Sequence, residues 1–220
     1  MCEFHVHIDA SSISCELEDF ALNQMGFYAS EFLAVDGKCY APTRHLTRKL
    51  DNRDDFLHTF DVIRTHAEST KGLNGFIEGE CVRYFPQPAP RPFNPSLPIP
   101  FRVTHKDLAL DTFREDEIHI TMDRDNSHPE LQQRLLEMGF FLAANRKPYG
   151  VAHIFTVQGT KQQIASLSPA IVRYLHEAGG ATHCKIKQEF IQAYWVSDSN
   201  VPLPPVVDAV NWLELREPNK

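Results

Sequence analysis

The sequence predicts an α+β protein made by tandem duplication of a ferredoxin-like βαββαβ unit, with two lobes that each contain an antiparallel sheet. Three observations support this prediction. Residues 3–9 and 117–123 both alternate apolar and polar side chains with a period of two. Apolar residues at helical spacing follow each stretch and lead into the same tripeptide, Met-Gly-Phe, at residues 25–27 and 138–140. Prolines crowd the region between the two copies.

The duplication divides the chain into four segments. We expect a first repeat over residues 1–88, a proline-rich linker over 89–113, a second repeat over 114–199, and a C-terminal tail over 200–220 that packs on the body. Prolines recur every two or three residues between 86 and 100, which predicts an extended linker without helix.

The first copy shows the elements in the order strand, helix, strand, strand, helix, strand. Asp36-Gly37 is a strong signal for a tight turn between its second and third strands. Asn52 is suited to cap the second helix at its start, and Gly72 to end it. The expected strands are residues 3–9, 28–35, 38–50 and 75–85, and the first helix ends near residue 25.

The second copy repeats this order. Ser127-His128-Pro129-Glu130 resembles a capping box at the start of a helix, and Thr160 begins the next helix. Pro169 is expected to kink or restart that helix. The expected strands are residues 117–123, 140–144, 149–157 and 182–196.

Composition narrows the classes of function. A net charge of −7 argues against binding of long nucleic acids, but two or three local cations suffice for a small phosphorylated molecule. The five cysteines show no paired spacing, so we expect a reducing, cytoplasmic location. The sequence contains no apolar stretch of membrane-spanning length, and no interaction with a membrane is expected.

Histidines concentrate on the polar faces of the first strands. Because helices cover one face of a ferredoxin-like sheet, the other face presents His5 and His7 in the first copy. In the usual strand order of such a sheet, the neighbouring strands add further polar residues to this face. Two groups of residues are therefore expected to converge. They are His5, His45 and Glu80 in the first copy, and His119, His153 and Glu189 in the second.

One hypothesis is metal-independent phosphoester hydrolysis. His45-Leu46-Thr47 forms an H-x-T motif on the third strand, and His153 occupies the corresponding strand of the second copy. This pattern resembles the 2H phosphoesterase family. The resemblance implies that His45 and His153 act as general acid and general base without a cofactor, and that Thr47 holds the phosphate. The residues themselves suggest that Arg44 and Arg48 neutralise a phosphate. The second H-x-T motif, His119-Ile120-Thr121, supplies further candidates for substrate binding.

A competing hypothesis is a divalent metal site. His5 and His7 lie one pleat apart on one strand face, and Glu80 is expected beside them. Two imidazoles and a carboxylate form a common ligand set for zinc, iron or manganese. Thr121 replaces the second histidine in the other copy, so the first copy is the better candidate.

A third, non-catalytic interpretation also remains open. The polar sheet faces could form only an interface between lobes, or between two chains of a homodimer. Histidine and threonine suit such half-polar contacts.

Overall fold

The computed structural model describes residues 3–34, 43–103, 116–123, 128–147 and 150–197. They form a mixed α+β protein in which helices accompany antiparallel strands. The described residues divide into two compact units. Unit 1 comprises residues 3–32, 43–82 and 191–197, and unit 2 comprises 33–34, 83–103, 116–123, 128–147 and 150–190.

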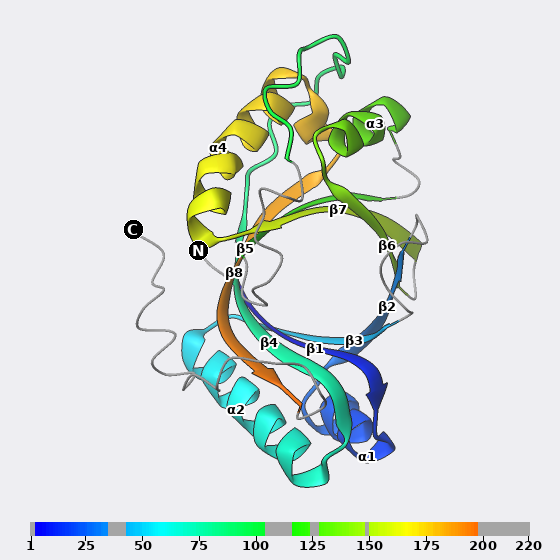
Figure 1. Ribbon diagram of the computed structural model, residues 1–220, viewed down its shortest axis with the longest axis vertical. Helices are drawn as coiled ribbons and strands as arrows, with labels where there is room; N and C mark the ends of the chain where they lie inside the picture. Colours follow the sequence, from blue (N-terminus) through cyan, green and yellow to red (C-terminus); the bar gives the residue numbers. More distant parts are fainter. Residues whose placement is uncertain (1–2, 35–42, 104–115, 124–127, 148–149, 198–220) are drawn as a thin grey trace. The chain divides into compact units, whose positions relative to one another are not determined.

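Unit 1 has a sheet with the strand order β4-β1-β3-β2, in which all paired strands are antiparallel. Helices α1 and α2 lie on the same side of this sheet (Figure 1). Its elements are β1 (Glu3–Ile13), α1 (Cys15–Asp19), the π-helical turn η1 (Phe20–Gln24), β2 (Tyr28–Ala34), β3 (Thr43–Leu50), α2 (Arg53–Thr70) and β4 (Leu73–Tyr84).

Polar side chains fix where the two helices of unit 1 begin. The Asn52 side chain accepts a hydrogen bond from the Asp55 backbone N–H at 2.8 Å, which confirms the predicted start of α2. Ser14 does the same for α1, accepting from the Leu17 N–H at 3.2 Å. Lys71 ends α2 in a left-handed conformation, one residue before the predicted stop.

The core of unit 1 lies between the sheet and α2. Val6 and Ile8 of β1 and Leu46 of β3 are fully buried there against helix residues that include Phe56. Gly79 of β4 allows the close approach of α2, because a Cβ atom at this position would lie 2.7 Å from the Phe56 ring. Apolar alternate residues therefore face the helices, and the residues between them face the other way.

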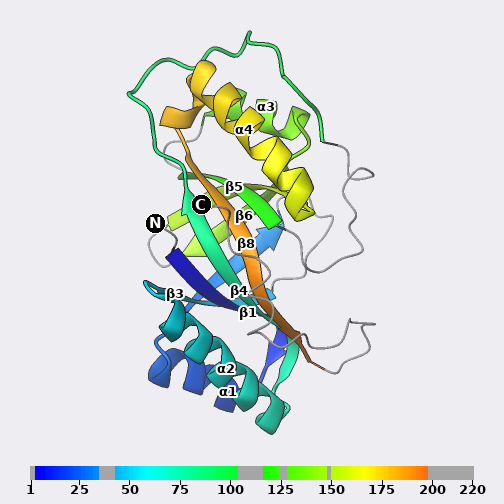
Figure 2. The ribbon, with the colours of Figure 1, turned by 90° about the vertical axis from the view of Figure 1, so that its left-hand side faces the viewer.

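Unit 2 has the strand order β8-β5-β7-β6, again antiparallel. Helices α3 and α4 both lie on one side of its strands (Figure 2). Its elements are β5 (Asp116–Asp123), α3 (Pro129–Glu137), β6 (Phe141–Lys147), β7 (Gly150–Gly159), α4 (Lys161–Glu177), the 3-10 turn η3 (Gly180–Thr182) and β8 (Lys185–Val196).

The helix starts of unit 2 agree in part with the prediction. Thr160 and Gln163 form a complete capping box at α4, which continues through Pro169 as one helix. His128 is the N-cap of α3 and makes no side-chain capping bond, while Pro129 occupies the first turn. The core of unit 2 contains Ile118, Ile120, Met122, Leu131, Leu135, Phe155, Val157, Ile164, Ile171 and Leu175.

The proline-rich segment is anchored to unit 2. Residues 86–103 contain no helix, as predicted, and run past α4 and α3 (Figure 2). The Asn94 N–H donates to the Ala178 carbonyl at 2.7 Å, and the Val103 N–H donates to the Met138 carbonyl at 2.8 Å. These bonds satisfy carbonyls at the C-terminal ends of both helices.

Strand β8 belongs to both units, because residues 185–190 are part of unit 2 and residues 191–196 are part of unit 1. In unit 1, the Ser197 N–H donates to the Gly75 carbonyl at 3.1 Å, and the Tyr194 ring stacks on Phe76 at 5.2 Å. In unit 2, the Phe85 N–H donates to the Ile186 carbonyl at 3.0 Å. Each unit thus includes residues from outside the stretch of sequence that forms its other strands and helices.

Some predictions lie outside the described residues. These concern the Asp36-Gly37 turn, Ser127, the linker beyond residue 103 and the tail over 200–220. Among the helices that the structure describes, none has the length and apolar character needed to cross a membrane.

Candidate metal centre on the polar face of unit 1

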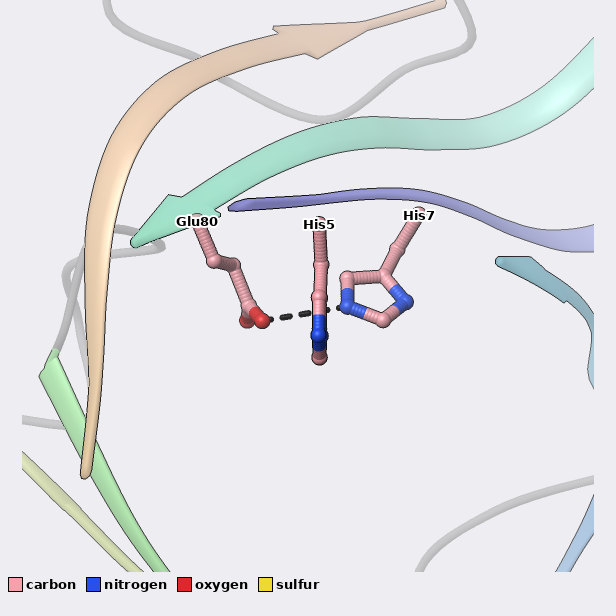
Figure 3. A group of neighbouring side chains, drawn as sticks. All are labelled: His5, His7 and Glu80. Carbon is pink, nitrogen blue, oxygen red and sulfur yellow. Dashed lines mark hydrogen bonds and ion pairs between the residues drawn. The ribbon is translucent and has the colours of Figure 1, made fainter. Parts of the chain in front are cut away.

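Three buried side chains converge on the face of the unit 1 sheet that points away from the helices. His5 and His7 project from β1, and Glu80 projects from the neighbouring strand β4 (Figure 3). One potential ligand atom of each residue lies within 4.8 Å of the others. His7 Nε2 is 3.0 Å from Glu80 Oε2. The structure therefore brings together the three residues that the sequence predicted as metal ligands.

The strand register explains this convergence. His5 pairs directly with Glu80 across β1 and β4, and His7 pairs with Glu78. Directly paired residues in antiparallel strands project to the same face, as do alternate residues along one strand. Gly79 faces Phe56 of helix α2, so its two neighbours Glu78 and Glu80 must face the other way.

A second group of side chains continues the cluster onto β3. His7 Nδ1 lies 3.1 Å from His45 Nε2 and 2.9 Å from Thr47 Oγ1. His45 Nδ1 in turn lies 2.8 Å from Asp9 Oδ1, and Thr47 Oγ1 lies 2.8 Å from His45 Nε2. Both His7 and His45 therefore contact a carboxylate with one ring nitrogen and each other with the second.

Glu3 closes the cluster beside His5. Its carboxylate lies 2.5 Å from His5 Nε2 and 2.9 Å from Lys49 Nζ. Burial raises the pKa of Glu3, but hydrogen bonds from His5 and Lys49 and their charges outweigh this effect, so the pKa is lowered overall. Glu3 is therefore ionised at neutral pH and orients the His5 ring.

The cluster is largely removed from water. His5, Thr47 and Glu80 are each 3% exposed, and His7 and His45 are 8% and 9% exposed. Buried carboxylates and imidazoles are costly unless they are hydrogen-bonded, ion-paired or bound to a metal. In this cluster Glu80 and Asp9 each contact an imidazole, a group that binds either a proton or a metal ion.

The donor set fits a divalent transition metal. Imidazole nitrogen and carboxylate oxygen bind such an ion at about 2.1 Å, so two ligand atoms of a tetrahedral site lie roughly 3.4 Å apart. The separation of His7 Nε2 and Glu80 Oε2, 3.0 Å, is already close to this value. A ligand atom of His5 lies within 4.8 Å of the ligand atoms of both other residues. Glu3 contacts His5, and His45 contacts His7. Glu3 and His45 are therefore placed as outer partners that orient the ligand histidines.

Unit 2 contains a different cluster at the same place in its sheet. His119 Nε2 lies 2.6 Å from carboxylate oxygens of both Glu117 and Glu189. Lys187 donates to Glu189, and Gln158 donates to Glu117. Burial lowers the pKa of His119, but the charge of Glu189 and the hydrogen bonds with both carboxylates raise it to about 9, despite the opposing charge of Lys187. The imidazolium and the ammonium thus supply positive charge for the two carboxylates.

The two units can be compared through strand register by setting His119 of β5 on His5 of β1. His5 faces Glu80 across β1 and β4, whereas His119 faces Lys187 across β5 and β8. The expected correspondence of Glu80 with Glu189 is therefore wrong by two residues. A group of three oxygen and nitrogen donors also exists in unit 2, formed by Glu117, His119 and Glu189. In unit 2, however, Lys187 places an ammonium group where unit 1 has the carboxylate of Glu80.

The same comparison changes the interpretation of His153. His45 pairs with Asp9 on the polar face, but His153 pairs with Met122, a core residue. The His153 ring accordingly contacts Gln132 of α3 at 3.3 Å. Ala152, not His153, corresponds to His45. The expected equivalence of the two histidines is wrong by one residue, and in a strand one residue reverses the face.

Arg44 and Arg48 also lie away from the cluster. They alternate with His45 and Thr47 along β3, so they share the opposite face with Leu46. Arg44 forms an ion pair with Glu18 of α1 on that side. Neither arginine is therefore placed to neutralise a phosphate beside His45, contrary to the expectation. Lys49 does share the face of Thr47, where it binds Glu3.

The remaining predicted residues lie within unit 2. His119 and Thr121 share the polar face of β5, and His119 Nδ1 lies 3.0 Å from Thr156 Oγ1. Thr121 stands at the position of His7, and Ile154 at the position of Thr47. At these two positions, the imidazole and the hydroxyl group of unit 1 are therefore replaced in unit 2 by a hydroxyl group and an apolar side chain.

The predicted site residues leave out several members of these clusters, Asp9 and Lys187 among them. Asp9 shares the polar face of β1 by alternation, but its contact with His45 depends on the register of β1 against β3. Lys187 was not among the predicted site residues, although strand register places it, and not Glu189, at the position of Glu80. The alternation of polar residues in 5–9 and 185–189 was the available signal, since it marks every residue of these strands that can share the face.

Comparison with known proteins yields no match. Neither a protein-family model, nor a curated protein, nor a solved structure is significantly similar to this chain.

Proposed function

We propose that unit 1 binds one divalent transition-metal ion, with zinc, iron and manganese as the candidates, through His5, His7 and Glu80. The observation that carries this proposal is the convergence of three buried ligand atoms within 4.8 Å of one another. The support from chemistry is the ligand set itself, since two imidazoles and one carboxylate are typical of catalytic zinc sites and of non-haem iron sites.

Three protein ligands leave at least one coordination position for water or substrate. An ion held in this way lowers the pKa of water and polarises ester or phosphoester oxygens. We therefore propose a small-molecule hydrolase as the activity of this centre. The polar face supplies acidic and imidazole groups, so an ion would also provide the positive charge that Arg44 and Arg48, on the other face, do not bring to a phosphorylated substrate.

The test is metal binding by the full chain after treatment with a chelator. We expect calorimetric titration with Zn²⁺, Co²⁺ or Mn²⁺ to give one tight site per chain and the ion to raise the melting temperature. Glu80→Gln, which keeps the shape of the side chain, should remove tight binding while the circular dichroism spectrum stays unchanged. His5→Ala and His7→Ala should do the same.

The matched control is His58→Ala, because His58 is an exposed histidine of α2 in the same unit. It should leave the affinity unchanged. Absence of a tight site in the unaltered protein, or a site that survives Glu80→Gln, would refute the proposal.

A second candidate function is metal-independent phosphoester hydrolysis. One observation favours it: His45 contacts Asp9 and Thr47, both at 2.8 Å, as a general base would contact an orienting carboxylate and a hydroxyl group. Hydrolysis of a cyclic phosphodiester that persists in a chelator and is abolished by His45→Ala would favour this function over the metal centre.

We also propose that the two units arose by duplication of one ferredoxin-like βαββαβ unit. Support comes from the element order, which is the same in both, and from the strand orders β4-β1-β3-β2 and β8-β5-β7-β6. On this interpretation unit 1 retained or acquired the ligands, and Lys187 and Thr121 replaced two of them in unit 2.

A further inference from the structure

A continuous chain of polar contacts connects Asp9 of β1 with Glu80 of β4. Asp9 Oδ1 lies 2.8 Å from His45 Nδ1, and His45 Nε2 lies 3.1 Å from His7 Nδ1. His7 Nε2 then lies 3.0 Å from Glu80 Oε2. The chain uses all four ring nitrogens of the two histidines, so the position of each ring hydrogen affects the next contact.

The carboxylate of Asp9 determines the tautomer of His45. An ionised carboxylate only accepts hydrogen bonds, so His45 Nδ1 must be the donor in this contact. In neutral His45 the other nitrogen, Nε2, is then an acceptor. It therefore accepts from His7 Nδ1 or from the Thr47 hydroxyl, which lies 2.8 Å away.

The same logic extends to His7. A donor is needed opposite His45 Nε2, and His7 Nδ1 is in place to donate either to this nitrogen or to Thr47 Oγ1, 2.9 Å away. The Glu80 carboxylate likewise accepts from His7 Nε2, so an ion bound at Nε2 would replace that hydrogen and leave the hydrogen on Nδ1 in place. Nε2 is the atom directed at Glu80 in the proposed metal centre.

We propose that Asp9 and His45 are positioning residues of the metal centre, which hold the hydrogen of His7 on Nδ1 and thereby present Nε2 to the ion. This inference rests on the proposed function. Metal-binding histidines generally donate their second ring N–H to an outer partner, and that partner fixes both the tautomer and the ring orientation. Here the outer partner is itself a histidine, oriented by a carboxylate.

The comparison of the two units supports a joint role for these residues. In unit 2 the positions of His7, Glu80, His45 and Thr47 hold Thr121, Lys187, Ala152 and Ile154. Three positions keep their residue type, since Glu117, His119 and Asp123 stand at the positions of Glu3, His5 and Asp9. Within the chain of contacts, His45, His7 and Glu80 therefore occur together in unit 1 and are replaced together in unit 2, whereas an aspartate stands at the position of Asp9 in both units.

The test uses the full chain with His45→Gln and Asp9→Asn, each titrated with Zn²⁺ and Co²⁺. Loss of an outer partner typically lowers metal affinity by roughly 10–100-fold, so we expect a loss of this size in both variants with one site retained. His58→Gln and Asp54→Asn, which alter exposed residues of α2 in the same unit, are the matched controls and should not change the affinity.

A tautomer measurement separates positioning from a general structural effect. In the zinc-loaded unaltered protein, nitrogen NMR should show hydrogen on His7 Nδ1 and metal at Nε2. In Asp9→Asn the hydrogen should be less firmly fixed on Nδ1, and Asp9→Glu should retain more of the metal affinity than Asp9→Ala.

Three outcomes would overturn the inference. Unaltered affinity in both variants would show that the chain does not position His7. A metal-induced shift at His45 nitrogen would make it a ligand rather than a positioning residue. Hydrogen on His7 Nε2 with metal at Nδ1 would reverse the proposed geometry. Absence of any tight site in the unaltered protein would instead refute the metal centre itself.

Discussion

His119 pairs with Lys187 across β5 and β8, at the position where His5 pairs with Glu80 across β1 and β4. Glu80 brings a negative charge to its cluster, whereas Lys187 brings a positive charge to the matching position of the other cluster. A carboxylate beside a histidine attracts a cation, whereas an ammonium in the same place repels it and neutralises the nearby Glu189. The difference leads to a direct prediction about the number of ions bound.

Glu80→Lys should transfer the arrangement of unit 2 to unit 1 and abolish metal binding. An ammonium next to His5 and His7 removes one ligand and adds a repulsive charge. Calorimetric titration should then show no tight site, although circular dichroism shows a folded chain. The control is Glu130→Lys, which makes the same change at an exposed position of α3. Tight binding by the Glu80→Lys protein would mean that the ion lies elsewhere.

Protein stability should fall as pH rises through the pKa of His119. This pKa is raised from 6.5 to about 9 in the folded protein, so the folded state binds the proton more tightly than the unfolded state. The stabilisation is complete below pH 6.5 and is lost as pH approaches and passes 9. Its size is on the order of 3 kcal/mol. Urea unfolding at several pH values measures it, and His119→Gln should be less sensitive to pH over this range. Equal slopes for both proteins would contradict the assignment.

Gly79→Ala should destabilise unit 1 and weaken the metal centre. The new Cβ would lie 2.7 Å and 2.8 Å from two ring carbons of Phe56, so β4 or α2 must shift. Overpacking of this kind costs about 1–3 kcal/mol of the free energy of unfolding. A shift of β4 also moves Glu80, so metal affinity should fall. Adding Phe56→Leu provides the check: in a double-mutant cycle it should recover part of the loss, and strictly additive effects would rule out the collision.

Arg44→Ala and Arg48→Ala should leave metal affinity and any phosphoesterase activity unchanged. Both side chains lie on the helix-facing side of β3, and Arg44 forms its ion pair with Glu18 there. A half-exposed pair of this kind contributes only about 0–1 kcal/mol, so stability should change little. A large loss of activity in either variant would show that substrate reaches the other face.

The strand faces could be predicted from the sequence because alternation is a local property. His5 and His7 share a face by their spacing alone, and the start of α2 follows from the capping chemistry of Asn52. Register could not be predicted in the same way, since backbone hydrogen bonds form in any register and side-chain packing selects among them. For this reason His153 was assigned to the wrong face.

Because β8 contributes residues to both units and is synthesised late, it affects how the chain folds during synthesis. Ala193 and Trp195, near the end of the described chain, belong to the core of unit 1, whose other residues come from the first half of the sequence. Residues 3–82 therefore leave the ribosome long before the last residues of their core are synthesised. Folding of unit 1 must wait for synthesis of β8, so nascent chains stopped after residue 103 should remain sensitive to protease, whereas release of the whole chain should bring protection.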